Sequence, residues 1–163
     1  MLIHVKNNNT LIIDDYNLKC CLGKNGINPY KKEGDYSTPK GVFKLKKLYF
    51  RKDRVPFIGN KIKKKIITKN MAWCDDPFQK KYNQEINVFN KEKNKEAFYR
   101  KDHSYDYLIT IDHNDKNIPF KGSAIFIHLT SDYKPTAGCI ALKKKDFQIM
   151  LKLINHKSKI KIG

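Results

Sequence analysis

The chain has 163 residues and 40% of them are hydrophobic, which suits one domain with a buried core and excludes a disordered chain. The formal net charge is +18, which is consistent with attraction to an anionic polymer. The lysines are spread along the whole chain and the only arginines are Arg51, Arg54 and Arg100. This pattern favours a compositional origin of the charge over specific nucleic-acid recognition. No apolar run reaches the length of a membrane-spanning helix.

The predicted elements are mainly short strands, because apolar runs of four to eight residues alternate with turn-rich segments. In chain order these strands cover residues 2–5, 10–14, 17–22, 42–49, 61–68, 105–113, 124–129 and 159–162, with a loop at 23–35 and a turn at 38–41. The charged segment 90–100 predicts a short exposed helix. Phe147, Met150, Leu151 and Ile154 recur at helical spacing, which predicts an amphipathic helix over 145–155. We expect a single mainly β domain over residues 1–163, with one helix near the C-terminus.

The segment 122–147 carries the strongest functional signal. It reads as an apolar strand containing His128, a turn-rich loop, and Gly138-Cys139 before a second apolar run. A glycine at this place lets a substrate approach the main chain. An imidazole beside a thiol can remove its proton, which is the arrangement that a cysteine nucleophile needs. Cys139 and His128 are therefore the predicted catalytic residues.

These residues resemble the catalytic segment of the L,D-transpeptidases, the YkuD-like cysteine enzymes that remodel bacterial peptidoglycan. The family signature is a histidine on a strand, a loop, and Ser/Thr-His-Gly-Cys, and it matches His128, Thr136, Gly138 and Cys139. Ala137 stands where the family usually has a second histidine, and the loop before Thr136 is shorter than usual. Two further segments, EGDYSTPKGVFKL at 33–45 and MAWCDDPFQKKYN at 71–83, resemble family segments of a compact branch that consists of the catalytic domain alone. The resemblance thus covers almost the whole chain.

The resemblance implies a β-sandwich of short strands and an acyl-transfer reaction through a cysteine acyl-enzyme. The implied substrate is the peptidoglycan stem peptide, which the family cleaves after its third, diamino-acid residue with release of D-alanine. The acyl group then passes to an amine of a second stem peptide or to water. The family works in the periplasm or cell envelope, although residues 1–14 show no charged leader followed by an apolar stretch. We expect a monomer that needs no cofactor.

Other candidate residues are less sharply defined. The main-chain N–H groups of Gly138 and Cys139 are the candidate oxyanion donors. The imidazole could be oriented by a main-chain carbonyl near Leu129 or by Asp132. The candidate residues of the substrate cleft are Thr136, Ala137, Trp73 and His113. Alternatively, Trp73 plugs the edge of the sheet and His113 lies in an exposed loop.

The remaining cysteines and carboxylates indicate no metal site. Cys20 and Cys21 are adjacent, and at least one is expected in the core. Cys74, in a loop-like segment, is a candidate second thiol near the cleft. Asp75 and Asp76 have no histidines at ligand spacing.

Two other functions remain open at this stage. The same thiol chemistry on another peptide would make the protein a cysteine amidase or peptidase. A non-catalytic basic module that binds an anionic polymer would lose affinity steeply with salt.

Overall fold

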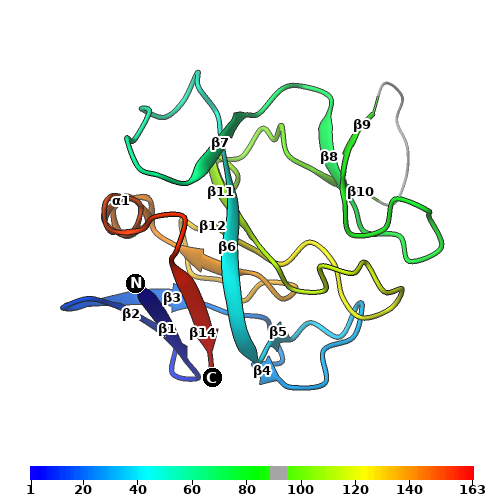
Figure 1. The fold of residues 1–163 in the computed structure, drawn as a ribbon, viewed down its shortest axis with the longest axis horizontal. Coiled ribbons are helices and arrows are strands. Elements are labelled where there is room, and N and C mark those ends of the chain that lie inside the picture. The colour runs from blue at the N-terminus through cyan, green and yellow to red at the C-terminus, as the bar shows by residue number, and fades with distance from the viewer. Residues whose placement is uncertain (89–94) are drawn as a thin grey trace.

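The structure is a computed structural model that describes residues 1–88 and 95–163. In these residues the chain forms fourteen strands and one helix (Figure 1). In chain order the elements are β1 (Leu2–Lys6), β2 (Thr10–Ile13), β3 (Tyr16–Cys21), β4 (Ile27–Asn28), β5 (Thr38–Pro39), β6 (Gly41–Phe50), β7 (Lys63–Ile66), β8 (Met71–Cys74), β9 (Glu85–Asn87), β10 (Lys95–Ala97), β11 (Tyr107–Ile111), β12 (Phe126–Leu129), β13 (Ile140–Leu142), α1 (Lys144–Leu153) and β14 (Lys159–Ile162).

The long strand β6 joins the two layers of a β-sandwich. Its first part pairs with β14, with Gly41 opposite Ile162, and its second part pairs with β11, with Phe50 opposite Tyr107. The strand order β11-β12-β13-β3-β2-β1-β14-β6 therefore closes on itself, and β7 extends the sheet beyond β6. Closure leaves few unpaired edges among these strands. The expected mainly β sandwich with a helix near the C-terminus is confirmed.

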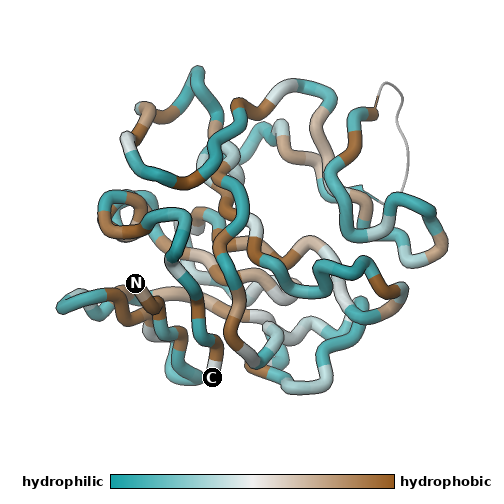
Figure 2. Tube along the Cα trace, in the orientation of Figure 1, coloured by the Kyte–Doolittle hydropathy of each residue, from teal (hydrophilic) through white to brown (hydrophobic). Residues whose placement is uncertain are grey.

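The strands β11 and β12 separate two apolar cores, because successive side chains point to opposite faces of a strand. Tyr107 and Ile109 face the larger core, whereas Leu108 faces a smaller core that also contains Phe126. The smaller core is covered by a three-stranded sheet in the order β10-β8-β9. His128 follows Phe126 by two residues and so lies on the face of the smaller core. Figure 2 shows hydrophobic residues along the inner strands and hydrophilic residues along most loops.

The helix α1 packs into the larger core through the residues whose spacing predicted it. Phe147, Met150 and Leu151 are fully buried, and the Phe147 ring stacks on Tyr107 with 5.6 Å between ring centroids. The first and last strands, β1 and β14, are parallel neighbours, so that the N- and C-termini lie at opposite ends of this pair (Figure 1). Among the described residues, no helix has the length and apolar character needed to cross a membrane.

Most predicted elements are confirmed, and three are corrected. The predicted turn at 38–41 begins with the short strand β5, which pairs in parallel with β4 because the loop before it folds back on itself. The segment 95–97 is the strand β10, where pairing with β8 overrides the helical charge spacing; residues 90–94 of the predicted helix lie outside the described part. Cys74 is a buried residue at the end of β8 and not part of a loop.

Candidate active site

The turn that carries Cys139 is held by Thr136. The Thr136 hydroxyl donates to the Cys139 carbonyl oxygen at 2.7 Å and accepts the Gly138 N–H at 3.1 Å. The Thr136 N–H donates to the Leu22 carbonyl at 2.9 Å, which ties the turn to the end of β3. Gly138 has a φ of 147°, and a Cβ at this position would lie 2.7 Å from the Ser37 carbonyl oxygen. The local structure therefore requires both the threonine and the glycine of the predicted motif.

His128 lies on the same face as Cys139. The strands β12 and β13 are parallel, with His128 opposite Ala141, and Cys139 lies two residues before Ala141. The alternation of side chains thus places the imidazole and the thiol on one face, and both residues line one cavity. No hydrogen bond joins the two side chains in this conformation; the thiol is bonded elsewhere.

The Leu129 carbonyl orients the imidazole. His128 Nδ1 lies 2.9 Å from this oxygen. Because a carbonyl oxygen can only accept, we assign the proton to Nδ1, which leaves the lone pair on Nε2. Asp132, the other candidate for this role, pairs with Lys134 at 3.0 Å. His128 therefore has the tautomer that a general base acting through Nε2 requires.

Tyr105 forms the wall against the imidazole, a contact that the sequence did not indicate. Its ring meets that of His128 edge to face with 5.2 Å between centroids. The Tyr105 hydroxyl donates to Glu96 Oε1 at 2.7 Å, and Arg100 Nη1 donates to the same oxygen at 3.2 Å. The Arg100 guanidinium also lies 5.0 Å from the Tyr105 ring centroid. The three side chains form one connected group beside the predicted base.

The Cys139 thiol donates to the Ala124 carbonyl oxygen at 3.1 Å, and its sulfur accepts the Phe126 N–H at 3.4 Å. Ala124 has a φ of 52°, an uncommon conformation for a residue with a Cβ. Its N–H donates to Asn83 Oδ1 at 3.2 Å. The conformation that presents the Ala124 carbonyl to the thiol is thus tied to the Asn83 side chain.

Asn83 links the site to Trp73 and His113, which line a cavity other than that of Cys139. The side chain of Asn83 is buried, and its Oδ1 accepts a hydrogen bond from the Trp73 Nε1–H at 3.0 Å. Its Nδ2 donates to the His113 carbonyl at 3.3 Å and to the Asn114 carbonyl at 3.0 Å. Trp73 and His113 line a second cavity of about 260 Å³. Neither is among the described residues that line the cavity of Cys139, whereas Thr136 and Ala137 are.

Burial determines the protonation of the candidate pair. It raises the pKa of the Cys139 thiol to about 12, and the Phe126 N–H and the Lys31 ammonium only partly oppose this. Burial is also the main reason that the pKa of His128 falls to about 4; the charge of Arg100 contributes to this shift, and the hydrogen bond to the Leu129 carbonyl partly opposes it. At neutral pH the site therefore holds a protonated thiol and a neutral imidazole, not a thiolate–imidazolium pair.

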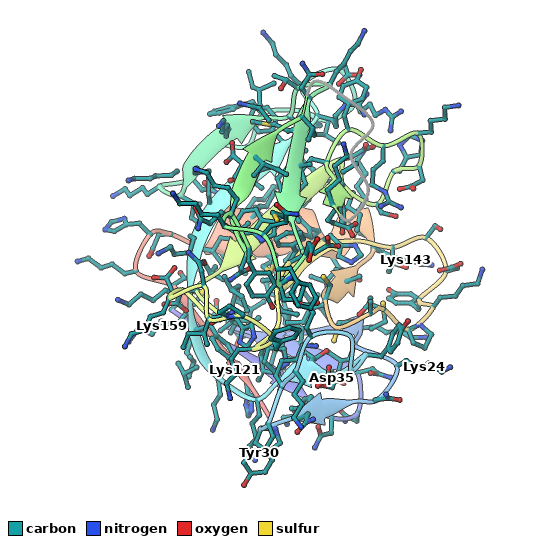
Figure 3. All side chains as sticks on the ribbon, turned by 90° about the vertical axis from the view of Figure 1, so that its right-hand side faces the viewer. Lys24, Tyr30, Asp35, Lys121, Lys143 and Lys159 are labelled. Atoms are coloured by element: carbon teal, nitrogen blue, oxygen red, sulfur yellow. The ribbon has the colours of Figure 1, made fainter. Side chains whose placement is uncertain are left out.

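The cavity of Cys139 and His128 has a volume of about 450 Å³. One wall comes from the loop before β5, where Lys31 is 8% exposed and pairs with Asp35. Although burial opposes ionisation, hydrogen bonds from Lys31, Lys32 and Ser37 hold the pKa of Asp35 below its usual range. Figure 3 labels Asp35 on the side of the molecule that faces right in Figure 1. This partly buried ion pair fixes the loop that packs under Gly138.

Three carboxylates that the sequence did not assign to the site also line the cavity: Glu33, Asp75 and Glu96. Glu33 accepts hydrogen bonds from the hydroxyls of Tyr82 and Ser123, the latter at 2.7 Å. Burial, and then the charge of Glu96, raises the pKa of Asp75. The described residues contain no group of three or more histidine, cysteine or acidic side chains that could hold a metal ion.

Residues 1–162 match the family model of the YkuD L,D-transpeptidase catalytic domain. The chain belongs to this family. No curated protein matches it. Among solved structures, the helical cell shape determining protein Pgp2 from Campylobacter jejuni is 15% identical with a TM-score of 0.52, and the match covers 99% of this chain and 46% of that chain. The K307A mutant of that protein gives 16% identity and a TM-score of 0.51, with the same coverage of each chain.

An L,D-transpeptidase from Mycobacterium smegmatis is 11% identical with a TM-score of 0.43, and the match covers 99% of this chain and 58% of that chain. The present chain spans about half the length of the Pgp2 chain that it resembles. At this identity the similarity to Pgp2 shows a shared fold.

Proposed function

We propose that this YkuD domain is a peptidoglycan L,D-transpeptidase that forms or edits stem-peptide cross-links through an acyl-enzyme on Cys139. The observation that carries the proposal is the placement of Cys139 and His128 on one face of β12 and β13, in one cavity, with the imidazole lone pair on Nε2. The family gives the substrate class. The proposal includes action in the periplasm or cell envelope, a monomeric catalytic unit over residues 1–163, and no specific nucleic-acid partner.

Acylation begins with a rotation of the Cys139 side chain away from the Ala124 carbonyl toward His128. His128 Nε2 takes the proton from Sγ while the sulfur attacks the carbonyl carbon of the stem peptide. The tetrahedral intermediate collapses when the C–N bond breaks and Nε2 returns the proton to the leaving amine. The products are a thioester on Cys139 and a free amine, D-alanine by analogy with the family.

The oxyanion of the intermediate requires a main-chain donor at the turn. The Gly138 N–H already donates to Thr136, so we assign the main role to the Cys139 N–H, with Gly138 joining if Thr136 releases it. In the second half-reaction an acceptor amine, or water, attacks the thioester and gives its proton to His128 Nε2. The C–S bond breaks and the sulfur recovers a proton from the imidazolium.

Mass spectrometry of the intact protein with a tetrapeptide stem tests this chemistry. We expect one acyl adduct on the wild type, none on Cys139→Ala, and a wild-type level of adduct on Cys74→Ala, the matched cysteine control. A carbapenem, the acyl-donor mimic that the family resemblance implies, should give the same pattern. An adduct that persists in Cys139→Ala, or an adduct that maps to Cys74, would refute the assignment of the nucleophile.

A further inference from the structure

A larger cavity adjoins the active site beyond His128. It has a volume of about 690 Å³ and includes Lys143, Lys144 and Lys145 in its wall, and we call it the lysine cavity. The lysine cavity and the catalytic cavity share Ser104, Leu129 and Thr130 as lining residues. A ligand that reacts at Cys139 can therefore extend past the end of β12 into the lysine cavity. Figure 3 labels Lys143 on the side of the molecule that also carries Asp35.

The acidic residues of the lysine cavity are already paired. Asp102 forms an ion pair with Arg100 at 2.9 Å. Asp106 is almost completely buried and pairs with Arg54 at 3.1 Å and with His103 at 2.6 Å. These two carboxylates therefore have little remaining capacity to neutralise the lysines.

The lysines of the cavity have no such partners. Lys143, Lys144 and Lys145 are exposed, and in the described part of the chain no carboxylate lies within 4.0 Å of their ammonium groups. The Lys143 ammonium instead lies 5.2 Å from the centroid of the Tyr133 ring. The cavity thus offers three uncompensated cations to whatever enters it.

The position of this cavity relative to the reaction indicates what it binds. Along β12, Phe126 lies beside the thiol, His128 follows, and Leu129 and Thr130 form the wall shared with the lysine cavity. The amine that leaves in acylation takes its proton from His128, and the amine that attacks in deacylation gives its proton to His128. In both half-reactions the amine therefore lies next to His128, and the residues that follow His128 form the wall shared with the lysine cavity. D-alanine carries a carboxylate on the carbon next to this amine.

We propose that Lys143, Lys144 and Lys145 form a subsite for the carboxylate of the amino acid on the amine side of the reaction. This subsite rests on the proposed acyl transfer and adds a substrate requirement to it. The domain releases or accepts amines that carry a neighbouring carboxylate more readily than amines that lack one. The wall that the two cavities share and the charge complementarity favour a small carboxylate over a long polymer.

The test compares two acceptors, D-alanine and D-alaninamide, for capture of the acyl-enzyme. Their ratio of capture rates within one protein cancels any change in acylation. We expect the Lys143→Gln, Lys144→Gln, Lys145→Gln triple variant to lower this ratio by about tenfold, the effect of one or two partly exposed ionic contacts. A matched triple variant, Lys69→Gln, Lys80→Gln, Lys157→Gln, removes the same charge from exposed positions outside this cavity and should leave the ratio unchanged. Added salt should lower the ratio in the wild type.

Two outcomes would overturn the subsite: an unchanged ratio in the cavity variant, or an equal fall in both triple variants. A cavity variant that keeps the ratio but loses binding of a fluorescent single-stranded oligonucleotide would assign the lysines to a nucleic-acid polymer instead.

Saturation-transfer NMR of D-alanine on Cys139→Ala separates the subsite from the chemistry, because binding there needs no thiol. D-alanine binding that the cavity variant abolishes supports the subsite even if no acyl-enzyme forms. Binding that the cavity variant leaves intact rejects the subsite, whatever the acylation result.

Discussion

The side chain of Asn83 is expected to control both the stability of the domain and the reactivity of Cys139. Its amide makes four hydrogen bonds, to Trp73 Nε1, the Ala124 N–H and the carbonyls of His113 and Asn114. A net value of about 1 kcal/mol for each bond gives a loss of roughly 3–4 kcal/mol on removal of the amide. In a domain of this size such a loss lowers the melting temperature by about 6–15 °C.

The substituted residue must also tolerate the backbone, since Asn83 has a φ of 56°. Asn83→Gly removes the amide without a penalty at this φ, whereas Asn83→Ala adds about 1 kcal/mol of backbone strain. Asn83→Asp keeps an acceptor for Trp73 and Ala124, but it loses the two bonds that the amide donates and turns an oxygen toward the carbonyls of His113 and Asn114. We expect all three variants to melt below the wild type, with Asn83→Ala below Asn83→Gly, measured by thermal denaturation.

The rate of Cys139 alkylation reports the positioning effect separately. Without Asn83 the Ala124 N–H loses its partner and the Ala124 carbonyl is no longer fixed against the thiol. We expect Asn83→Gly to raise the alkylation rate at least several-fold, as expected for loss of about 1 kcal/mol of restraint. Asn83→Asp should stay close to the wild type. Buried Cys74 serves as the internal control for general opening of the fold.

Two results would refute this reasoning. An unchanged melting temperature in Asn83→Gly would mean that the four hydrogen bonds do not form as described. A lower melting temperature with an unchanged Cys139 alkylation rate would mean that Ala124 does not restrain the thiol. A parallel rise in Cys74 alkylation would assign the effect to unfolding instead.

Three further changes test other parts of the site. Gly138→Ala should cost roughly 1–3 kcal/mol of unfolding free energy and abolish acylation, because its φ and the close Ser37 carbonyl both exclude a Cβ; a stable, active variant would contradict this. Acylation should persist as the pH falls from 7 and lose half its rate near pH 4, where buried His128 takes a proton. The unfolding free energy should decline earlier, below about pH 6.5, because the unfolded chain binds that proton first. Tyr105→Leu should slow acylation by about tenfold, because His128 loses the ring that packs against it. Tyr105→Phe should keep the acylation rate within about threefold of the wild type. Equal losses of rate in both variants would mean that the Tyr105 hydroxyl, and not its ring, supports His128.

The parts of the fold that could be predicted from the sequence are those in which local pattern and tertiary packing agree. The helix α1 follows from the spacing of Phe147, Met150 and Leu151, and the same residues fill the core. The strand β10 could not be predicted, because pairing with β8 overrides a charge pattern that favours a helix. Its pairing depends on a partner that lies more than twenty residues earlier in the chain.

The candidate site divides in the same way. His128 and Cys139 are close in the sequence and carry a recognisable signature, so their proximity could be predicted. Tyr105 and Asn83 reach the site from distant parts of the chain; Tyr105 belongs to no motif, and Asn83 ends the segment 71–83, whose likeness to the family does not indicate its hydrogen bonds. Trp73 was a candidate residue of the cleft, but its indole N–H donates to Asn83 and its side chain lines a different cavity. Such contacts depend on the closed sheet, which the order of apolar runs does not specify.

The strong positive charge of the chain does not make the Cys139 thiol acidic. Burial, with a further contribution from Glu96, keeps Cys139 protonated, and the Phe126 N–H and Lys31, which lines the same cavity, oppose this only in part. At neutral pH the thiolate fraction is therefore very small, and both alkylation and oxidation of a free thiol depend on the thiolate. In the proposed mechanism, a substrate carbonyl displaces the Ala124 contact and brings the sulfur toward the lone pair of His128, so that the proton can leave. The proposed nucleophile is then protected at rest, and its activation depends on the same ligand that it attacks.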